Sequence, residues 1–326
     1  MKIGILSDIH ELSWIFKLQN QTKRETALEY LIKDIILKDA EEMDLLIIAG
    51  DIGESPSRII NFLRAMKKYS NIEKILFTAG NHEHYSSFKI NKLYDYPIRY
   101  SSNPEKPLED PQSMIRDREL EEIFSIYEND GIKKVNLLID YINENIDGVI
   151  ATNNGETLDI DGIKIAGTSG WYDGKSFYEK HKNSFGTMPF ESNFIQRKIE
   201  KVYEKNLDRK YASEKPFDNW NNYYKEIIEN METDLDIIIT HPIPMIETMA
   251  FDEEYKFSDQ NAFFSFDGIE MIKEKRPKYW IHGHSHNKRI WDVYDTTVIR
   301  APLGHMTEWD ERGRINNLTY INIIGE

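Results

Sequence analysis

The sequence contains no cysteine, so the chain can form neither a disulfide bond nor a metal site built from thiolates. It also lacks any run of about 18 apolar residues, the length that a membrane-spanning helix needs. The apolar run that follows Lys2 ends at Leu6, which is too short for a secretion signal and suits a first β-strand. These absences predict a cytoplasmic protein with no membrane partner.

Positive charge is scarce as well. The 326 residues include 41 Lys and Arg against 56 Asp and Glu, which gives a formal net charge of −15. An acidic surface repels the phosphate backbone of nucleic acids, so a nucleic acid is possible as a substrate but is not favoured. Hydrophobic residues make up 40% of the chain, which is enough for a sizeable core.

Short apolar runs alternate with helical patterns along the chain, which indicates the α/β class. We expect strands at seven apolar runs, which read "KIGIL", "DLLIIAG", "KILFTAG", "GIKIAGT", "LDIIIT", "KYWIHG" and "TTVIRAP". Helical spacing of apolar residues covers seven further ranges, which are 25–39, 55–69, 117–128, 132–145, 191–205, 218–231 and 267–275.

Two segments fit a packed core less well. One is rich in Tyr, Pro, Ser and charge, and the other is aromatic and leans basic. Long segments of this kind in compact domains tend to be functional loops or disordered insertions. We therefore predict a single domain over residues 1–326 with cap or loop insertions at 85–130 and 171–216; a disordered surface insertion is the alternative.

Residues that can bind metals follow five of the predicted strands directly. They are Asp8, His10, Asp51, Asn81, His241, His284 and His286. Ligand sites in open α/β sheets gather at the carboxyl ends of strands, so we expect these side chains to converge. Oxygen and imidazole ligands without sulfur suit Mn, Fe, Zn, Co or Ni. Seven ligands exceed the need of one tetrahedral site and suit two ions that share a carboxylate.

Five short motifs occur in order at these positions, namely "SDIH", "AGDIGE", "GNHE", "THP" and "GHSH". In this pattern the chain resembles the calcineurin-like metallophosphoesterase superfamily, in particular its bacterial-type members, over nearly its whole length. The resemblance implies a four-layer α/β/β/α sandwich of two mixed sheets with helices on both faces. It also implies hydrolysis of a phosphoester by a hydroxide that bridges two metal ions.

The resemblance further implies a role for each residue. Asp8, His10 and His286 would hold the first ion, Asn81, His241 and His284 the second, and Asp51 would bridge the two. Manganese is the expected metal, with Fe, Zn, Ni or Co as alternatives. His82 would act as the general acid, and Asn81 and His82 would contact the substrate. Glu54 stands where many members carry an Asp that orients this histidine.

One departure from the family pattern bears on the substrate. Ser55 stands where the protein Ser/Thr phosphatases of the family carry a phosphate-binding Arg, which argues against a phosphoprotein substrate. A phosphate of lower charge fits this loss, so a small phosphodiester is slightly favoured. A phosphomonoesterase that acts on nucleotides or other small phosphates is the alternative. A non-catalytic binding scaffold is the alternative from another class.

Other polar residues near the motifs have simpler interpretations. Glu83 is predicted to bind the turn that contains it, and His282 to be structural. For His305, a place at the edge of the site stays an alternative to a structural role. The mixed charges of 198–210 predict a solvated helix face.

Overall fold

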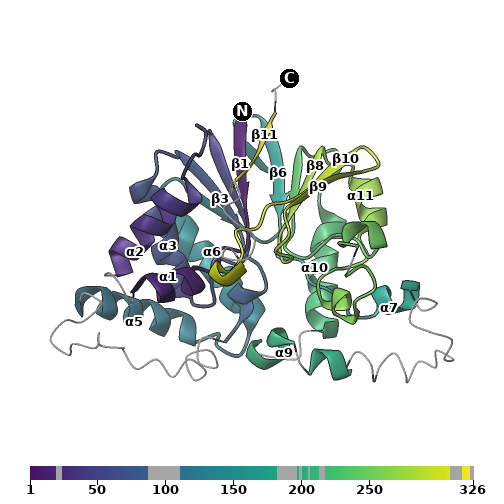
Figure 1. The fold of residues 1–326 in the computed structure, drawn as a ribbon, viewed down its shortest axis with the longest axis horizontal. Helices are drawn as coiled ribbons and strands as arrows, with labels where there is room; N and C mark the ends of the chain where they lie inside the picture. Colours follow the sequence, from purple (N-terminus) through teal and green to yellow (C-terminus); the bar gives the residue numbers. More distant parts are fainter. Residues whose placement is uncertain are drawn as a thin grey trace.

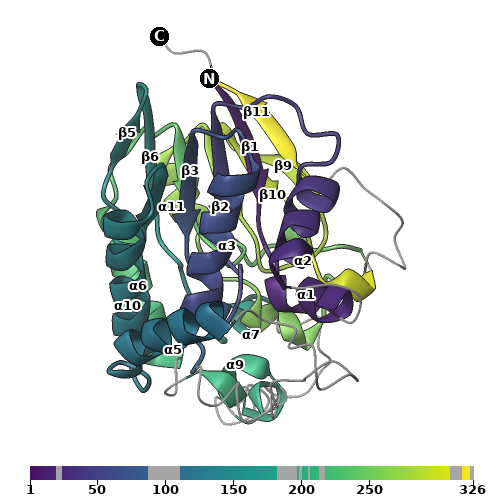
Figure 2. The same cartoon turned by 90° about the vertical axis from the view of Figure 1, so that its left-hand side faces the viewer.

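The computed structural model of the protein describes residues 1–19, 24–86, 111–181, 197, 200–204, 206–212, 217–253, 255–308 and 318–323. Two β-sheets pack face to face at the centre, and helices cover the outer face of each sheet (Figure 1). The view turned by 90° shows α1, α2 and α3 lying across the strands of the first sheet (Figure 2). The chain is therefore built in four layers.

The first sheet has five strands in the order β11-β1-β2-β3-β4. Strands β1, β2, β3 and β4 run parallel to one another. The edge strand β11 pairs antiparallel with β1. The strand bounds are β1 (Lys2–Leu6), β2 (Leu45–Ala49), β3 (Lys74–Thr78), β4 (Val149–Thr152) and β11 (Thr319–Asn322).

The second sheet has six strands in the order β5-β6-β7-β8-β10-β9. The four inner strands run parallel, and the two edge strands β5 and β9 are antiparallel to their neighbours. The strand bounds are β5 (Leu158–Ile160), β6 (Ile163–Gly167), β7 (Ile237–Ile239), β8 (Tyr279–His282), β9 (Arg289–Val293) and β10 (Thr296–Arg300).

Helices of the first half of the chain pack on the first sheet, and those of the second half lie beside the second sheet (Figure 1). The former are α1 (Glu11–Gln19), α2 (Arg24–Tyr30), the π-helix η1 (Leu31–Ile36), α3 (Pro56–Tyr69), α5 (Pro111–Ser125) and α6 (Gly131–Asn145). The latter are α7 (Ser176–His181), α10 (Phe217–Asn230) and α11 (Ile269–Lys275). The short 3-10 helices are η2 (His82–His84), η4 (Thr248–Ala250) and η5 (Asp259–Phe263). The short helix α9 (Leu207–Tyr211) lies at the carboxyl end of the strands (Figure 1).

Strand β2 explains why the sheets are buried on both faces. Successive side chains of a strand point to opposite faces, so a strand between two layers needs apolar residues throughout. Leu45 and Ile47 pack between the two sheets, whereas Leu46 and Ile48 pack against the helices. The same alternation holds in β7, where Ile237 faces the first sheet and Ile238 faces α10 and α11. The predicted sandwich of two mixed sheets is thereby confirmed.

The seven predicted strands are all present, and the structure adds β4, β5, β9 and β11. The predicted helix at 25–39 divides into α2 and a π-helical turn, and the predicted helix at 191–205 lies mostly outside the described residues. Short helices α1, α7 and α9 lack a long apolar period, which is the reason that the sequence did not predict them. None of the described helices is long and apolar enough to cross a membrane.

Candidate active site and metal centre

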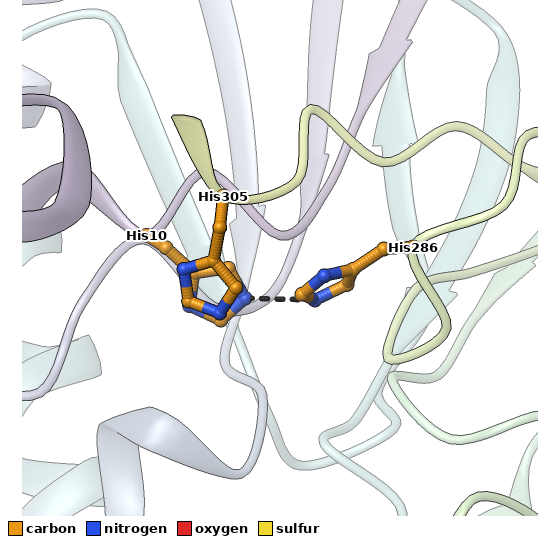
Figure 3. Close-up of side chains that lie close together, drawn as sticks. All are labelled: His10, His286 and His305. Carbon is orange, nitrogen blue, oxygen red and sulfur yellow. Dashed lines mark hydrogen bonds between the residues drawn. The ribbon is translucent and has the colours of Figure 1, made fainter. Parts of the chain in front are cut away.

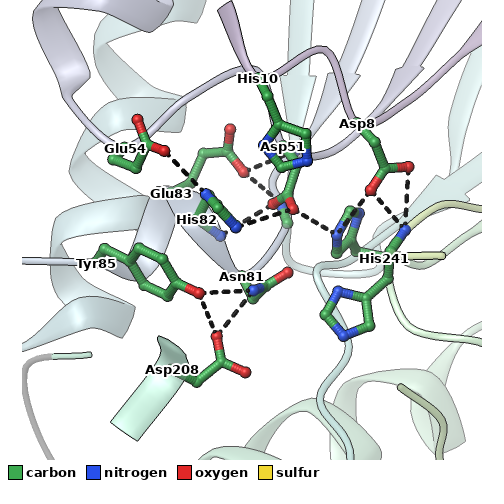
Figure 4. Close-up of polar contacts among 12 residues, drawn as sticks. Asp8, His10, Asp51, Glu54, Asn81, His82, Glu83, Tyr85, Asp208 and His241 are labelled. Carbon is green, nitrogen blue, oxygen red and sulfur yellow. Dashed lines mark hydrogen bonds and ion pairs between the residues drawn. The ribbon is translucent and has the colours of Figure 1, made fainter. Parts of the chain in front are cut away.

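The carboxyl ends of β1, β2 and β3 in one sheet and of β7 and β8 in the other deliver polar side chains to one place. Figure 4 shows these side chains meeting at the strand ends. Asp51 Oδ2 lies 3.1 Å from His241 Nε2, so the contact joins the two sheets. Asp8 Oδ1 lies 3.7 Å from His286 Nε2 and 3.8 Å from His241 Nε2. The structure therefore brings together residues that are far apart in the sequence.

Four of the seven predicted ligands have left-handed backbone conformations. The φ angles are 51° for Asp8, 46° for His10, 59° for Asp51 and 69° for His284. Non-glycine residues rarely adopt positive φ, and each such residue costs on the order of 1–3 kcal/mol. Strain of this kind tends to collect at functional sites, because the surrounding fold holds the side chain where its chemistry is needed.

Gly283, directly after β8, allows this end of β8 to approach the end of β1. A Cβ atom at this position would lie 2.6 Å from Asp8 Oδ2 and 2.8 Å from Ser7 Cβ, closer than real side chains come. The absence of a side chain lets the backbone N–H of His284 donate to Asp8 Oδ1 over 2.8 Å. The glycine between the histidines thus fixes the position of Asp8 against β8.

Among the residues that the structure describes, three sets of side chains place ligand atoms within 4.8 Å of one another, close enough to hold a metal ion. Asp51 belongs to two of them, one with His10 and His82 and one with His241 and His284. The third set joins His10, His286 and His305. A carboxylate shared by neighbouring sets is what two adjacent ions with a common ligand would require.

The histidine rings are oriented by contacts on the side that faces away from the site. His241 Nδ1 lies 2.8 Å from Ala49 O, and His284 Nε2 lies 2.9 Å from Phe263 O. His286 Nδ1 lies 2.9 Å from both carboxylate oxygens of Glu308. Metal-binding histidines typically donate their second ring N–H in this way, which leaves the other nitrogen free to bind the ion.

Asn81 provides a direct test of the fit to a metal. Its Oδ1 atom is buried and has no hydrogen-bond partner among the residues that the structure describes. A buried polar atom without a partner costs free energy, so such atoms usually mark a bound group. An amide oxygen beside imidazoles and a carboxylate is a ligand set for a divalent ion, and the residues present fit one.

His305 lies nearer to the site than the motifs indicate. Its ring stacks on His10 with 4.2 Å between the ring centroids, and it meets the His286 ring at 5.1 Å (Figure 3). His10 Nε2 and His286 Nε2 face each other at 3.0 Å. The alternative that placed His305 at the edge of the site is therefore the one that the structure supports.

The negative charge of Asp51 favours a proton on the neighbouring His241 or a cation bound beside it. Burial opposes the charge of Asp51, but His241 and His82 outweigh burial and hold the pKa of Asp51 well below its usual range. Burial likewise lowers the pKa of His241, but the charge and contact of Asp51 together with the charge of Asp8 outweigh burial and raise the pKa to about 9. A cation that binds His241 must displace this proton, so metal affinity at the site depends on pH.

His82 is held between two carboxylates. Its Nδ1 atom lies 3.1 Å from Glu54 Oε1, and its Nε2 atom lies 3.8 Å from Asp51 Oδ2. Burial opposes protonation of His82, but the charges of Asp51 and Glu54 raise its pKa to about 10. The longer arm of Glu54, compared with Asp, thus still reaches the histidine, which carries a proton at neutral pH.

Glu83 binds the backbone beneath the site, as predicted. Its carboxylate accepts hydrogen bonds from the backbone N–H of Gly80 at 2.6 Å, of Ile52 at 2.8 Å and of Asp51 at 3.0 Å. Burial and the charge of Asp51 raise the pKa of Glu83 to about 7. The residue therefore ties the end of β2 to the end of β3.

A cavity of about 1000 Å³ opens above the site. His10, Asp51, Asn81, His82, His284 and His286 line it, whereas Asp8 and His241 are buried beneath and are not among its lining residues. The lining also includes six residues from within the predicted insertion at 171–216, which are Arg197, Lys201, Val202, Asn206, Leu207 and Asp208. Within the range 198–210, for which a solvated helix face was predicted, the described residues Lys201, Val202, Asn206, Leu207 and Asp208 line this cavity.

Three residues at the site carried no signal in the sequence. Glu308 orients His286, and Asp208 and Tyr85 contact Asn81. None belongs to a motif, and each lies in or beside a segment without apolar periodicity. The sequence could have suggested only that an acidic residue near the last histidines orients one of them.

The comparisons with known proteins agree with this geometry. The family model described as calcineurin-like phosphoesterase matches residues 1–288. Among solved structures, phosphopantetheinyl hydrolase from Mycobacterium tuberculosis superposes with a TM-score of 0.59 at 15% identity, covering 98% of this chain and 95% of that one. GAP50, the anchor in the inner membrane complex of Plasmodium, gives a TM-score of 0.35 at 9% identity, covering 98% and 77%. A search of curated proteins found no match. The strand-end ligands, the two-sheet sandwich and the family match together establish that the chain belongs to the calcineurin-like phosphoesterases, which are metal-dependent hydrolases.

Proposed function

We propose that this protein hydrolyses a small phosphodiester with two divalent metal ions. The observation that carries the proposal is the convergence of seven side chains at the strand ends, with Asp51 common to two sets of closely spaced ligand atoms; the seven are Asp8, His10, Asp51, Asn81, His241, His284 and His286. Asp8, His10 and His286 would hold one ion, and Asn81, His241 and His284 the other, with Asp51 as the shared ligand. When bound, the two ions supply a nucleophile from water and neutralise charge on the phosphoryl oxygens.

The ligand set supports manganese as the metal, with Fe, Zn, Ni or Co as alternatives. Carboxylate and amide oxygens together with imidazole nitrogens suit divalent ions of intermediate hardness, and the chain has no thiolate to select a softer one. Elemental analysis of the purified protein tests the number and identity of the ions. A protein that holds no transition metal after purification and reloading would contradict the proposal.

His82 is proposed as the general acid for the leaving group. It lines the cavity beside Asp51 and Asn81, so a substrate phosphate bound there would lie within its reach. Burial opposes protonation of His82, but in the metal-free protein the charges of Asp51 and Glu54 raise its pKa to about 10, and the contact with Glu54 favours the protonated state that a proton donor needs. Glu54 would hold the ring in place through its contact with Nδ1.

The size of the cavity supports a diester rather than a phosphomonoester. Its volume of about 1000 Å³ is at the upper end of the usual range for small-molecule sites, roughly 300–1,000 Å³. A diester carries two organic groups and uses such space, whereas a small monoester leaves most of it to water. Lys201 and Arg197 line the wall opposite the metal ligands, and we propose that they bind anionic or polar parts of the substrate.

A phosphomonoesterase remains the second candidate, because the same two cations could bind the extra charge of a monoester. A comparison of rates for bis-p-nitrophenyl phosphate and p-nitrophenyl phosphate in the presence of Mn²⁺ decides between them, with Asp51→Asn as the control. A faster diester supports the proposal, and the search for the natural substrate then starts from small diesters. The fold neighbour is named for a phosphopantetheinyl substrate, so such an ester belongs in the panel. A faster monoester would overturn the preference inferred from Ser55 and the cavity.

A further inference from the structure

The inserted segment places a buried carboxylate against the site. Asp208 lies in the first turn of the short helix α9, and only 1% of its surface is exposed. The backbone N–H of Asp208 donates to Asn206 Oδ1 over 2.8 Å, which caps the helix and fixes the residue. Asp208 contributes to the wall of the cavity but to none of the three sets of potential metal ligands.

Three hydrogen bonds satisfy the Asp208 carboxylate, and Figure 4 shows the two that come from Tyr85 and Asn81. Its Oδ1 atom accepts from Tyr85 Oη at 2.6 Å and from Asn81 Nδ2 at 2.8 Å. Its Oδ2 atom accepts from Tyr172 Oη at 2.7 Å. Burial and the charge of Asp208 raise the pKa of both tyrosines well above the usual range, so both keep the hydroxyl protons that they donate.

These contacts determine which way the Asn81 amide points. An asparagine amide has a donor end and an acceptor end, and its neighbours decide which end faces which way. A carboxylate oxygen at 2.8 Å can only face the nitrogen, because the amide oxygen would be repelled there. The Oδ1 atom of Asn81 is consequently directed away from Asp208, and it is the buried oxygen without a partner among the described residues.

We propose that Asp208 is a positioning residue for the second metal ion. It holds the Asn81 amide with its oxygen toward the metal, and its negative charge polarises the amide so that this oxygen binds a cation more strongly. The segment that contains α9 would thus both line the cavity and stabilise the metal centre. This inference rests on the proposed dinuclear function.

The test measures Mn²⁺ binding to the full-length chain by titration calorimetry and by electron paramagnetic resonance, which distinguishes a coupled pair of ions from a single ion. Loss of a carboxylate that orients a metal ligand typically weakens metal binding by about 10–100-fold. Asp208→Ala should weaken the second ion by that factor and leave the first ion unchanged, so that the signal of the coupled pair gives way to that of a single ion.

Tyr172→Phe is the matched control, because it removes a hydrogen bond to the same carboxylate but none to Asn81. Its loss of second-ion affinity should be much smaller than that of Asp208→Ala. Asp208→Asn, which has the shape of Asp208 but no charge, should fall between the two. If Asp208→Ala does not fold, Asp208→Asn and Tyr172→Phe still decide the question.

The outcomes separate two failures. If the wild-type chain binds two Mn²⁺ ions and the Asp208 variants bind both with unchanged affinity, the role of Asp208 is overturned. An equal loss of both ions in Asp208→Ala would also overturn it, because Asp208 would then support the fold rather than the second ion. If the wild-type chain itself binds fewer than two ions, the proposed dinuclear function fails.

Discussion

Histidine residues of this chain occupy very different electrostatic surroundings, although several lie within a few residues of one another. His82 lies beside two carboxylates, whereas His84 is enclosed by aromatic rings and is completely buried. The pKa of His82 is raised to about 10, and burial lowers that of His84 to about 3. Each difference leads to a separate prediction for a single residue.

Substitution of His82 should slow catalysis without removing the metal. Loss of a general acid typically costs roughly 10²–10⁴-fold in rate, so we expect a reduction of kcat in that range for His82→Ala. Glu54→Gln should cost less, because it keeps a hydrogen-bonding group beside Nδ1 but removes the charge. Steady-state kinetics with Mn²⁺-loaded protein measures both. A variant of His82 with full activity and full metal content would contradict the role of proton donor.

His84 should make the fold sensitive to acid. Its pKa is about 3 in the folded protein and near 6.5 when exposed, so the unfolded chain takes up a proton first as the pH falls. Stability is therefore unaffected by His84 above pH 6.5 and is lost progressively between about pH 6.5 and 3. Between pH 7 and pH 5 this amounts to about 2 kcal/mol. Urea unfolding of wild type and His84→Gln at both pH values should show a smaller loss in the variant; equal losses would contradict the prediction.

At the scale of the elements, the loops after the strands position the predicted metal ligands. At some positions in these loops the neighbouring atoms leave no space for a side chain. A Cβ atom at Gly80, just after β3, would lie 2.8 Å from both Asp51 N and His241 Cγ. At Gly53, in the loop after β2, an added Cβ would meet no atom of the described residues within 4 Å. The two glycines thus form a matched pair on neighbouring loops.

Gly80→Ala should disrupt the site, whereas Gly53→Ala should leave it nearly intact. The methyl group at position 80 has to displace the backbone of Asp51 or the ring of His241, both of which are fully packed. We expect Gly80→Ala to lose metal affinity and activity by at least about tenfold, a loss like those seen when groups that orient metal ligands are removed. Calorimetric titration with Mn²⁺ and a rate assay compare the two variants, and similar behaviour of both would contradict the steric argument.

The inserted segment offers a second matched pair. Both Lys201 and Lys210 are exposed, but Lys201 lines the cavity, whereas Lys210 is not among its lining residues and lies over the ring of Tyr211, 5.1 Å from its centroid. If Lys201 binds the substrate, Lys201→Ala should raise KM several-fold with little change in kcat, because it removes binding common to the ground and transition states. Lys210→Ala, which removes the same charge from the same segment, serves as the control. An equal effect of both would indicate a general loss of positive charge rather than a contact.

At the scale of the whole molecule, the proposed metal centre lies where the two sheets meet. Asp8, Asp51 and Asn81 follow strands of the first sheet, and His241, His284 and His286 follow strands of the second. Ions bound to both groups would link the sheets at their carboxyl ends. A ligand that binds only the folded protein raises its stability, by about 2.7 kcal/mol at a concentration of 100 Kd.

Removal of metal should therefore lower the thermal stability of the entire domain. We expect chelation to lower Tm by several degrees and Mn²⁺ to restore it, with activity lost and regained in parallel. Differential scanning calorimetry with and without chelator measures the change. In Asp51→Asn the response to Mn²⁺ should be much reduced, because the ligand shared by both sets is weakened; a full response in that variant would contradict a centre that depends on Asp51.

The sequence by itself predicted which polar residues converge and the class of the fold. Apolar runs that end in polar residues are local features, and parallel strands bring their carboxyl ends to one edge, so Asp8, Asp51 and His284 could be predicted to converge. The two-sheet sandwich came from the family resemblance of the motifs rather than from periodicity. The strands β4, β5, β9 and β11 were not predicted, because all four are edge strands that are only partly buried, so polar residues interrupt their apolar pattern.

Tertiary structure alone decided what surrounds the ligands. Asp208 contacts Asn81 across 127 positions of sequence, and Glu308 contacts His286 across 22. No periodicity or spacing rule links such positions, because the contacts depend on how an inserted segment and a final loop fold back onto the sheets. Local motifs therefore predict which residues would bind the metal. The orientation of these residues depends on packing between distant parts of the chain.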